Sequence, residues 1–217
     1  MKKPRATVVI VGAAVLASLS VVLQILPPFF LTPFYMRIDL VAVPWMLAWM
    51  LFGVRSALLS LLISVPLVGV LGPFAGGWVG AIMKSVSSLW MFIIPAAFAH
   101  RFGMERLLAN RQLYAISGIA AIAVRDVATI VFNLYFAIPV FFGMTPDQVI
   151  HFFSTSQSFF GLSVGLVGLG AYLGEVAFWN TVQAIIDLYA SLIVGLIVLR
   201  QFPLLRTGSD QPPRPPP

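Results

Sequence analysis

Long apolar segments, separated by short polar or Pro/Gly-rich breaks, dominate the chain. The first apolar run follows three basic residues near the N-terminus and continues without a charge to about Leu26, where Pro27-Pro28 ends it. At about 20 residues it is long enough for a transmembrane helix, whereas the apolar region of a signal peptide has about 7–15 residues. We therefore expect a retained first membrane helix. A signal peptide is the competing interpretation, because Ala17 and Ser18 supply small residues.

The same pattern predicts five further membrane helices. Their expected bounds are about 39–53, 56–71 with a kink at Pro66, 78–99, 113–140 and 175–199. The first two spans are joined by a loop over 27–37, and residues 141–158 are expected to form a loop or a surface helix. The apolar run from 159 to 199 exceeds a single span of about 20 residues. A Gly-rich stretch to about Gly174 is therefore expected to lie along, or dip into, the outer face before the last helix begins at Glu175.

Composition supports a membrane protein. Hydrophobic residues make up 60% of the chain and charged residues 9%, against about 25% charged residues in a soluble domain. We expect an all-α integral membrane protein with one six-helix domain over 1–206 and a disordered or extended Pro-rich tail over 207–217. The chain has no cysteine, so it has no disulfide and no Cys-based metal site. We predict no metal and no cofactor.

The basic residues flank the apolar segments and do not line one face, which indicates membrane orientation and not nucleic-acid binding. Only Arg37 is expected outside, while Lys84 and Arg125 fall within helices. With the N-terminus inside, the cytoplasmic segments hold the remaining ten of the thirteen Lys and Arg residues: Lys2, Lys3, Arg5, Arg55, Arg101, Arg106, Arg111, Arg200, Arg206 and Arg214. The sequence predicts six spans in the cell membrane with both termini in the cytoplasm.

Four polar side chains are expected at one depth inside the membrane. From a rise of about 1.5 Å per residue, Lys84, Asn133, Asn180 and Gln183 lie roughly 8–12 Å below the outer surface, on three different helices. A few donors and acceptors that converge in an apolar setting are typical of a ligand pocket, here open to the outside. The alternative is hydrogen bonding between helices, worth about 0.6 kcal/mol per bond on average.

Two further charges are expected deeper, near the middle of the bilayer. Arg125 and Asp187 are predicted to form a buried structural ion pair, because an unpaired charge at that depth is costly. Asp126 lies on a different face of its helix from Arg125. A proton or ion relay is the alternative interpretation.

Several segments resemble one known family, the substrate-binding (S) components of energy-coupling-factor vitamin transporters, the riboflavin type in particular. The resemblance extends from about Val11 to Arg200. It rests on Arg37-Ile38-Asp39 with Pro44 and Phe52-Gly53 after it, on Phe92–Phe98, on Phe132–Pro139 and on Phe178–Gln183. It implies a prokaryotic protein that captures a vitamin outside the cell, with the first loop closing over it.

The resemblance also implies roles for single residues. Asn133 and Asn180 match asparagines that hold the flavin ring, and Gln183 stands where the family has a lysine that contacts the ligand. Lys84, in the fourth helix, could restore that positive charge. Asp39, at the end of the first loop, is the fifth candidate ligand-binding residue and is expected to act with Arg37 in loop closure. Because Gln183 departs from the family pattern, another vitamin or a nucleobase-like compound is the alternative ligand.

Partner subunits follow from the same resemblance. The family docks on an energising membrane subunit that is coupled to two ATP-binding subunits. Ala13 and Ala17 match its small-residue docking face, and such spacing lets helices approach closely. The chain has no Gly-x-x-x-x-Gly-Lys loop, so any ATP would be hydrolysed by a partner and the chain itself is not expected to be an enzyme.

Two other classes of protein remain as alternatives. Gly161-Leu162-Ser163-Val164-Gly165 fits the Gly-x-Ser-x-Gly pattern of serine hydrolases, with His151 as the conceivable base. No strand precedes this serine, and the glycines of this stretch fit close helix packing better. A membrane scaffold without a ligand is the second alternative.

Overall fold

The computed structural model describes residues 6–32, 36–71, 77–155 and 168–202, and nearly all of them are helical. The helices are α1 (Ala6–Ile25), α2 (Val43–Phe52), α3 (Val54–Leu71), α4 (Gly77–Phe102), α5 (Met104–Ala109), α6 (Arg111–Phe132), the π-helical turn η1 (Asn133–Ala137), α7 (Ile138–Phe142), α8 (Pro146–Thr155) and α9 (Gly168–Gln201). A two-stranded antiparallel hairpin, β1 (Phe30–Leu31) and β2 (Arg37–Ile38), lies between α1 and α2. The predicted tail, 207–217, falls outside the described residues.

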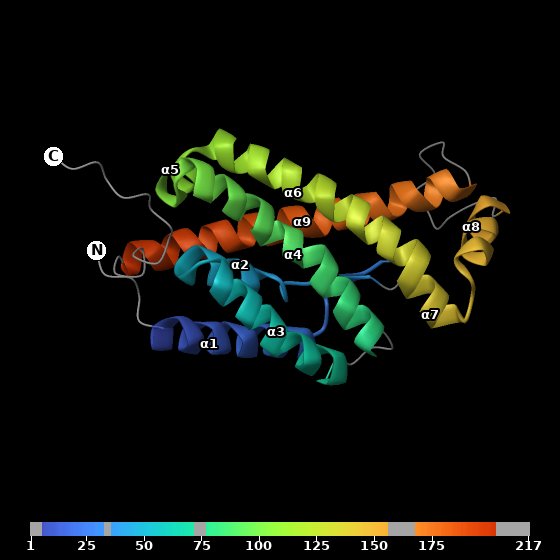
Figure 1. Cartoon of the computed structure of the whole chain (residues 1–217), viewed down its shortest axis with the longest axis horizontal. Helices are drawn as coiled ribbons and strands as arrows, with labels where there is room; N and C mark the ends of the chain where they lie inside the picture. Colours follow the sequence, from blue (N-terminus) through green and yellow to red (C-terminus); the bar gives the residue numbers. More distant parts are fainter. Residues whose placement is uncertain (1–5, 33–35, 72–76, 156–167, 203–217) are drawn as a thin grey trace.

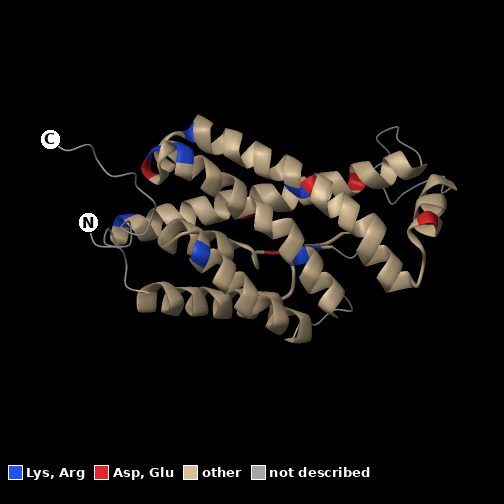
Figure 2. Cartoon of the chain, viewed as in Figure 1, with Lys and Arg blue, Asp and Glu red and all other residues tan. Residues whose placement is uncertain are grey.

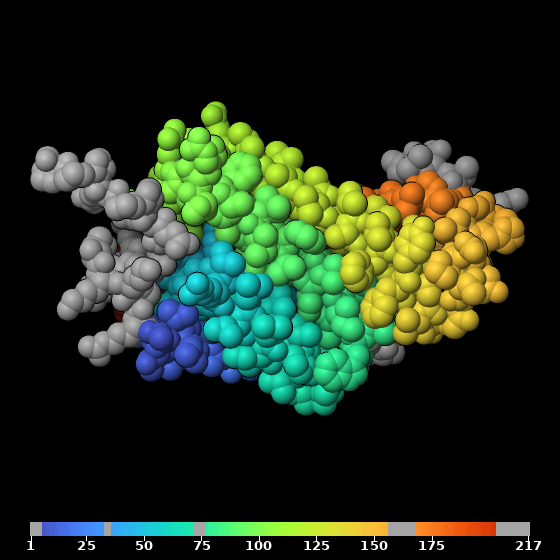
Figure 3. All heavy atoms as spheres, viewed as in Figure 1, coloured from blue at the N-terminus to red at the C-terminus, as the bar shows by residue number. Residues whose placement is uncertain are grey.

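The long helices run along the length of the molecule as a bundle (Figure 1). Among the described residues, five helical segments are long and apolar enough to cross a membrane: α1, α3, α4, α9 and the continuous segment from α6 through α7. The chain therefore has the build of a multi-pass membrane protein, as the sequence predicts. Helices α3, α4 and α6 lie side by side on the face shown in Figure 3, where only one end of α9 is seen.

The two ends of the bundle differ in charge. Helix α1 begins and α9 ends at the same end of the molecule (Figure 1). Among the described residues, the helix termini at this end carry Arg55, Arg101, Arg106, Arg111 and Arg200, and we call it the basic end. Lys and Arg gather there in Figure 2, whereas acidic residues mark α8 and the beginning of α9 at the opposite end. We call that opposite end the far end.

Helix α2 is shorter than the predicted membrane span over 39–53. It begins at Val43 and has 10 residues, so it is about 15 Å long, half the thickness of the hydrocarbon core. Two local features delay its start. The Asp39 carboxylate accepts the backbone N–H of Val41, which favours a turn, and Pro44 occupies the first turn of a helix comfortably. The second predicted span is therefore a bent segment followed by a half-length helix.

Helix α2 lies at the centre of the bundle. Every one of its residues except Phe52 is buried, and it packs against α1, α3, α4 and α9. Glycines on its neighbours allow the close approach. A methyl group at Gly12 of α1 would meet the Phe52 ring at 2.5 Å, and one at Gly195 of α9 would meet the Met50 sulfur at 2.8 Å. This central position explains why α2 is apolar on all sides.

Helix α9 begins earlier than predicted. The stretch from Gly168 to Gly174, expected to lie along or dip into the outer face, forms the first two turns of the helix. The reason is packing on α8, where the Tyr172 ring stacks on the Phe153 ring with 3.9 Å between centroids. This tertiary contact outweighs the poor helix propensity of the glycines. Residues 159–167 of the same predicted stretch lie outside the described residues.

The other bounds follow the sequence pattern closely. Pro66 lies inside α3 as expected, and the segment predicted as a loop or surface helix contains α8. The polar connection after α4 contains the short helix α5. It is followed by Asn110, whose side chain accepts the backbone N–H groups of Gln112 and Leu113 and so caps α6.

A buried polar network as the candidate functional site

Asp39 lies where the hairpin meets the helical bundle. Its carboxylate is 2.5 Å from the Lys84 ammonium group on α4 and 3.7 Å from Nε of Arg37 on β2. Its backbone is held by the Gln183 amide on α9. The Asp39 N–H donates to Oε1 at 3.0 Å, and Nε2 donates to the Asp39 carbonyl at 2.7 Å. One residue thus ties the hairpin to two long helices.

The network continues through α9 to α6. Gln183 Nε2 also donates to Asp187 at 2.8 Å, and Asp187 pairs with Arg125 Nη1 at 3.2 Å. Arg125 Nε lies 3.4 Å from the Asn180 oxygen, and the Asn180 Nδ2 donates to the Val176 carbonyl at 2.9 Å. Lys84, Asp39, Gln183, Asp187, Arg125 and Asn180 therefore form one continuous network. The predicted ion pair between Arg125 and Asp187 is confirmed.

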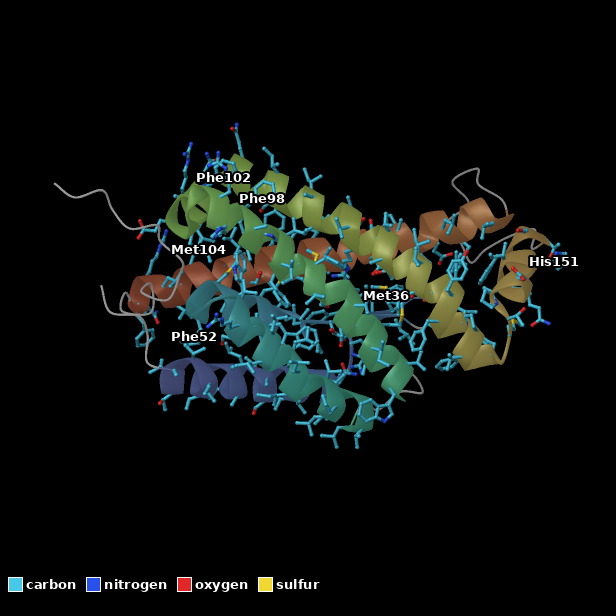
Figure 4. The ribbon with its side chains drawn as sticks, viewed as in Figure 1. Met36, Phe52, Phe98, Phe102, Met104 and His151 are labelled. Carbon is cyan, nitrogen blue, oxygen red and sulfur yellow. The ribbon has the colours of Figure 1, made fainter. Side chains whose placement is uncertain are left out.

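The two ion pairs of the network differ in setting. The Arg125 and Asp187 side chains are 2% and 0% exposed and both belong to long helices; we call them the helix pair. The Lys84 and Asp39 side chains are 19% and 7% exposed, and Asp39 belongs to a non-helical segment; we call them the loop pair. In Figure 4, Met36, directly before β2, lies over the middle of the bundle in projection, far from His151 at its far end. The loop pair thus lies where the hairpin segment meets α4.

Four of the five predicted ligand-binding residues meet in this network: Lys84, Asp39, Gln183 and Asn180. Their polar groups bind one another. Gln183 in particular uses its amide oxygen and both amide hydrogens. In this conformation the network has the geometry of hydrogen bonding between helices, which was the alternative to a pocket.

Asn133, the fifth predicted residue, stands apart. It begins the π-helical turn η1, and the N–H of Ile138 bonds to its backbone carbonyl. The adjacent Pro139 has no N–H to donate, which explains the local change of helix type. The Asn133 side chain is half-buried and makes no hydrogen bond within the described part of the chain. Its amide is therefore free to bind another molecule.

Other buried polar atoms lack a hydrogen-bond partner within the described residues. On α6 these are Asp126 Oδ1 and Thr129 Oγ1, and on α9 they are Glu175 Oε1 and Trp179 Nε1. Asp126 accepts one hydrogen bond, from Thr181 on α9 at 2.9 Å, and lies off the face that carries Arg125, as expected. Buried polar groups are normally paired, so such atoms point to water, an ion or a ligand.

Neither Thr129 nor Glu175 is among the site residues predicted from the sequence. Glu175, Trp179, Gln183 and Asp187 nevertheless follow one another at intervals of four. Such spacing places side chains along one face of a helix, and in α9 that face meets the hairpin. The spacing was therefore a usable signal for Glu175. Thr129 gives no comparable signal, because threonine is common in membrane helices.

Ala13 and Ala17, the predicted partner-docking residues, lie inside the bundle. Both are buried, at 0% and 1% exposure, on a helix that packs against α2 and α3. Their small side chains allow this close packing within the chain, which accounts for their spacing. Neither presents a surface to another protein in this structure.

The described residues do not test the hydrolase alternative. Ser163 lies outside the described residues, and His151 is exposed on α8. Within the described part of the chain no group of three or more His, Asp or Glu residues is placed to hold a metal ion.

Comparison with known proteins identifies no relative. No family model, no curated protein and no solved structure matches the chain.

Proposed function

We propose that the chain is the membrane-embedded, substrate-binding component of an energy-coupling-factor transporter that takes up a vitamin into a prokaryotic cell. Riboflavin is the first candidate ligand, and another vitamin or a nucleobase-like compound is the alternative. The observation that carries the proposal is the buried polar network, which joins the hairpin to α4, α6 and α9 inside an otherwise apolar bundle. Charged groups in a membrane interior are costly and mark functional sites.

The proposal includes six crossings with both termini in the cytoplasm. The arginines of the basic end support this orientation, since cytoplasmic segments are rich in Lys and Arg. One of the six crossings is then made by the hairpin and the half-length helix α2. Non-helical backbone at membrane depth is tolerated where protein buries it, and Asp39 and Val41 are buried here. The far end, with α7 and α8, then faces the outside.

The hairpin acts as the movable part in this mechanism. Its attachment through Asp39 to Lys84 and Gln183 describes a closed state without ligand. A ligand that offers its own donors and acceptors can replace some of these bonds, because the exchange leaves no buried group unpaired. Uptake then requires an energising membrane subunit and two ATP-binding subunits, which this chain does not supply. The proposal assigns no docking role to Ala13 and Ala17, since both are buried.

A non-transporting membrane scaffold is the second candidate function. It is favoured by one observation, that Lys84, Asp39, Gln183, Asp187 and Arg125 already satisfy one another. A scaffold of this kind needs no ligand, whereas a transport component does. Ligand-induced stabilisation of the purified protein separates the two.

The experiment is a titration of detergent-purified protein with riboflavin, followed by quenching of flavin fluorescence. We expect saturable binding at submicromolar concentration and a loss of about 1–3 kcal/mol in binding free energy for Asn133→Ala, because a ligand group is left unpaired. Gln112→Ala, which removes an exposed amide at the basic end, is the matched control and should bind normally. Absence of quenching by folded protein rules out riboflavin. Absence of stabilisation by any vitamin or nucleobase tested favours the scaffold.

A further inference from the structure

Glu175, Trp179, Gln183 and Asp187 form a polar stripe along one face of α9. The side chains in one half of this stripe have hydrogen-bond partners, whereas those in the other half have polar atoms without one. Toward the basic end, Gln183 and Asp187 have hydrogen-bond partners for their side-chain groups. Toward the far end, Glu175 is only 5% exposed, yet its Oε1 has no hydrogen-bond partner, and neither does the buried Nε1 of Trp179. Polar atoms without a hydrogen-bond partner therefore begin at Trp179, one turn beyond Gln183 toward the far end.

The unsatisfied half lies against the hairpin. The Trp179 ring stacks on the Phe30 ring of β1, with 5.1 Å between centroids and 30° between planes. Phe178 meets the Trp179 ring edge-on at 5.1 Å. Aromatic faces and one carboxylate thus lie together beside the residue that holds Asp39. None of the ion pairs found among the described residues involves Glu175.

A buried carboxylate oxygen without a hydrogen-bond partner, such as Glu175 Oε1, has a structural cost. Removing a carboxylate from water without a partner disfavours the folded state, and nothing described in the fold compensates for it at Oε1. A ligand that donates a hydrogen bond to Glu175 Oε1 removes this cost, which explains why the carboxylate lies there. The ligand must also offer an acceptor, because the indole N–H of Trp179 can only donate.

We propose that Glu175 and Trp179 form a subsite that selects a flat heteroaromatic ligand with a lactam or imide edge. The ring N–H of the ligand donates to the Glu175 carboxylate, and an adjacent ligand carbonyl accepts the Trp179 N–H. Residues four apart on a helix face the same side, so the acceptor and the donor can address one edge. A ligand ring can stack on the outer face of the Trp179–Phe30 pair, where Phe30 is 47% exposed. This inference rests on the proposed function.

The subsite differs from the one that the sequence resemblance implies. There, Asn133 and Asn180 hold the ring. In the structure the Asn180 amide donates to the Val176 carbonyl and its oxygen lies beside Arg125, so it is occupied. Glu175 offers an acceptor on the same helix that is not occupied. Recognition of the N–H edge is therefore assigned to Glu175.

The test compares parent ligands with analogues that lack the ring N–H. Riboflavin, uridine and guanosine are titrated against 3-methylriboflavin, 3-methyluridine and 1-methylguanosine. We expect at least one parent to bind wild-type protein at least about tenfold more tightly than its methylated partner, since the methyl group removes the donor to Glu175. Glu175→Leu should bring this ratio close to one, and Trp179→Phe, which keeps an aromatic ring, should weaken the parent by a smaller factor. Asp147→Asn, an exposed carboxylate on α8, is the control and should change neither.

Thermal unfolding without ligand guards against misfolded variants. Glu175→Leu should melt at or above the wild-type temperature, because it removes a buried carboxylate oxygen that has no hydrogen-bond partner; a clear decrease would mean that the carboxylate supports the fold and would overturn the proposal. Equal binding of parent and methylated ligand overturns the subsite while leaving the proposed function intact. If uridine or guanosine binds more tightly than its methylated partner by the expected factor while riboflavin does not bind, the subsite is supported and riboflavin is excluded as the ligand. No binding of any of the three parents overturns the subsite, whereas the proposed function fails only if no vitamin or nucleobase tested stabilises the protein.

Discussion

The helix pair and the loop pair are chemically alike and mechanically different. Arg125 and Asp187 connect two long helices that cannot separate without opening the bundle. Lys84 and Asp39 connect a helix to a short hairpin, and the Lys84 side chain retains partial exposure. Breaking the helix pair is therefore a global event, whereas breaking the loop pair is a local one. The comparison suggests that the first holds the fold and the second controls access.

The largest effect is expected from the helix pair. Asp187→Leu leaves the Arg125 guanidinium buried without its carboxylate, and removal of one partner of a buried ion pair typically costs about 3–5 kcal/mol. The free energy of unfolding, measured by denaturant titration in detergent micelles, should fall by that amount. The double variant Arg125→Met with Asp187→Leu should recover most of the loss, because no unpaired charge remains.

Glu105→Gln provides the control for these variants, since Glu105 is exposed on α5. Its effect on the free energy of unfolding should be negligible. If Asp187→Leu cost no more than Glu105→Gln, the helix pair would not hold the fold and the comparison would fail.

A smaller and more local effect is expected from the loop pair. Asp39→Asn removes the charge that faces Lys84 but keeps an acceptor for the Val41 N–H, so the free energy of unfolding should fall by about 1–3 kcal/mol. Loosening of the hairpin acts on ligand escape, so the dissociation rate should rise more than the association rate changes. Stopped-flow measurement with riboflavin checks this. An unchanged dissociation rate would exclude a role of Asp39 in closure.

The smallest effect is expected at the contact between α6 and α9 that involves neither pair. Thr181→Val removes the hydrogen bond to Asp126 and should lower the free energy of unfolding by about 0.5–1.5 kcal/mol. Ligand kinetics should stay unchanged, because the bond does not touch the hairpin. A faster dissociation rate in this variant would show that any weakening of the bundle mimics Asp39→Asn, and the distinction between the pairs would be lost.

Much of the architecture was predictable because it depends on local pattern. Apolar length located the long helices, and the depth of Arg125 and Asp187 along their helices anticipated their pairing. Helix α2 was harder. Its residues are as apolar as a membrane span, and only the turn at Asp39 and the position of Pro44 shorten it.

The detail of the site was less predictable because it depends on contacts distant in sequence. Asp39 and Gln183 are 144 residues apart, and no spacing rule connects them. Because Asp39 and Gln183 hydrogen-bond to each other, these groups are not available to a ligand. Their depth along the helices could not predict this. The burial of Ala13 and Ala17 shows the same limit, since small residues serve equally for packing within a chain and between chains.

The most direct test of the account is amide hydrogen exchange of the hairpin and of α9, with and without saturating riboflavin. Without ligand, residues 36–42 should exchange faster than 180–190, because the loop pair opens locally and the helix pair does not. With ligand, exchange of 36–42 should slow by about tenfold or more, which corresponds to about 1.4 kcal/mol, while exchange of 180–190 stays the same. Equal exchange in the two regions, unaffected by bound ligand, would contradict the claim that the hairpin controls access to the site.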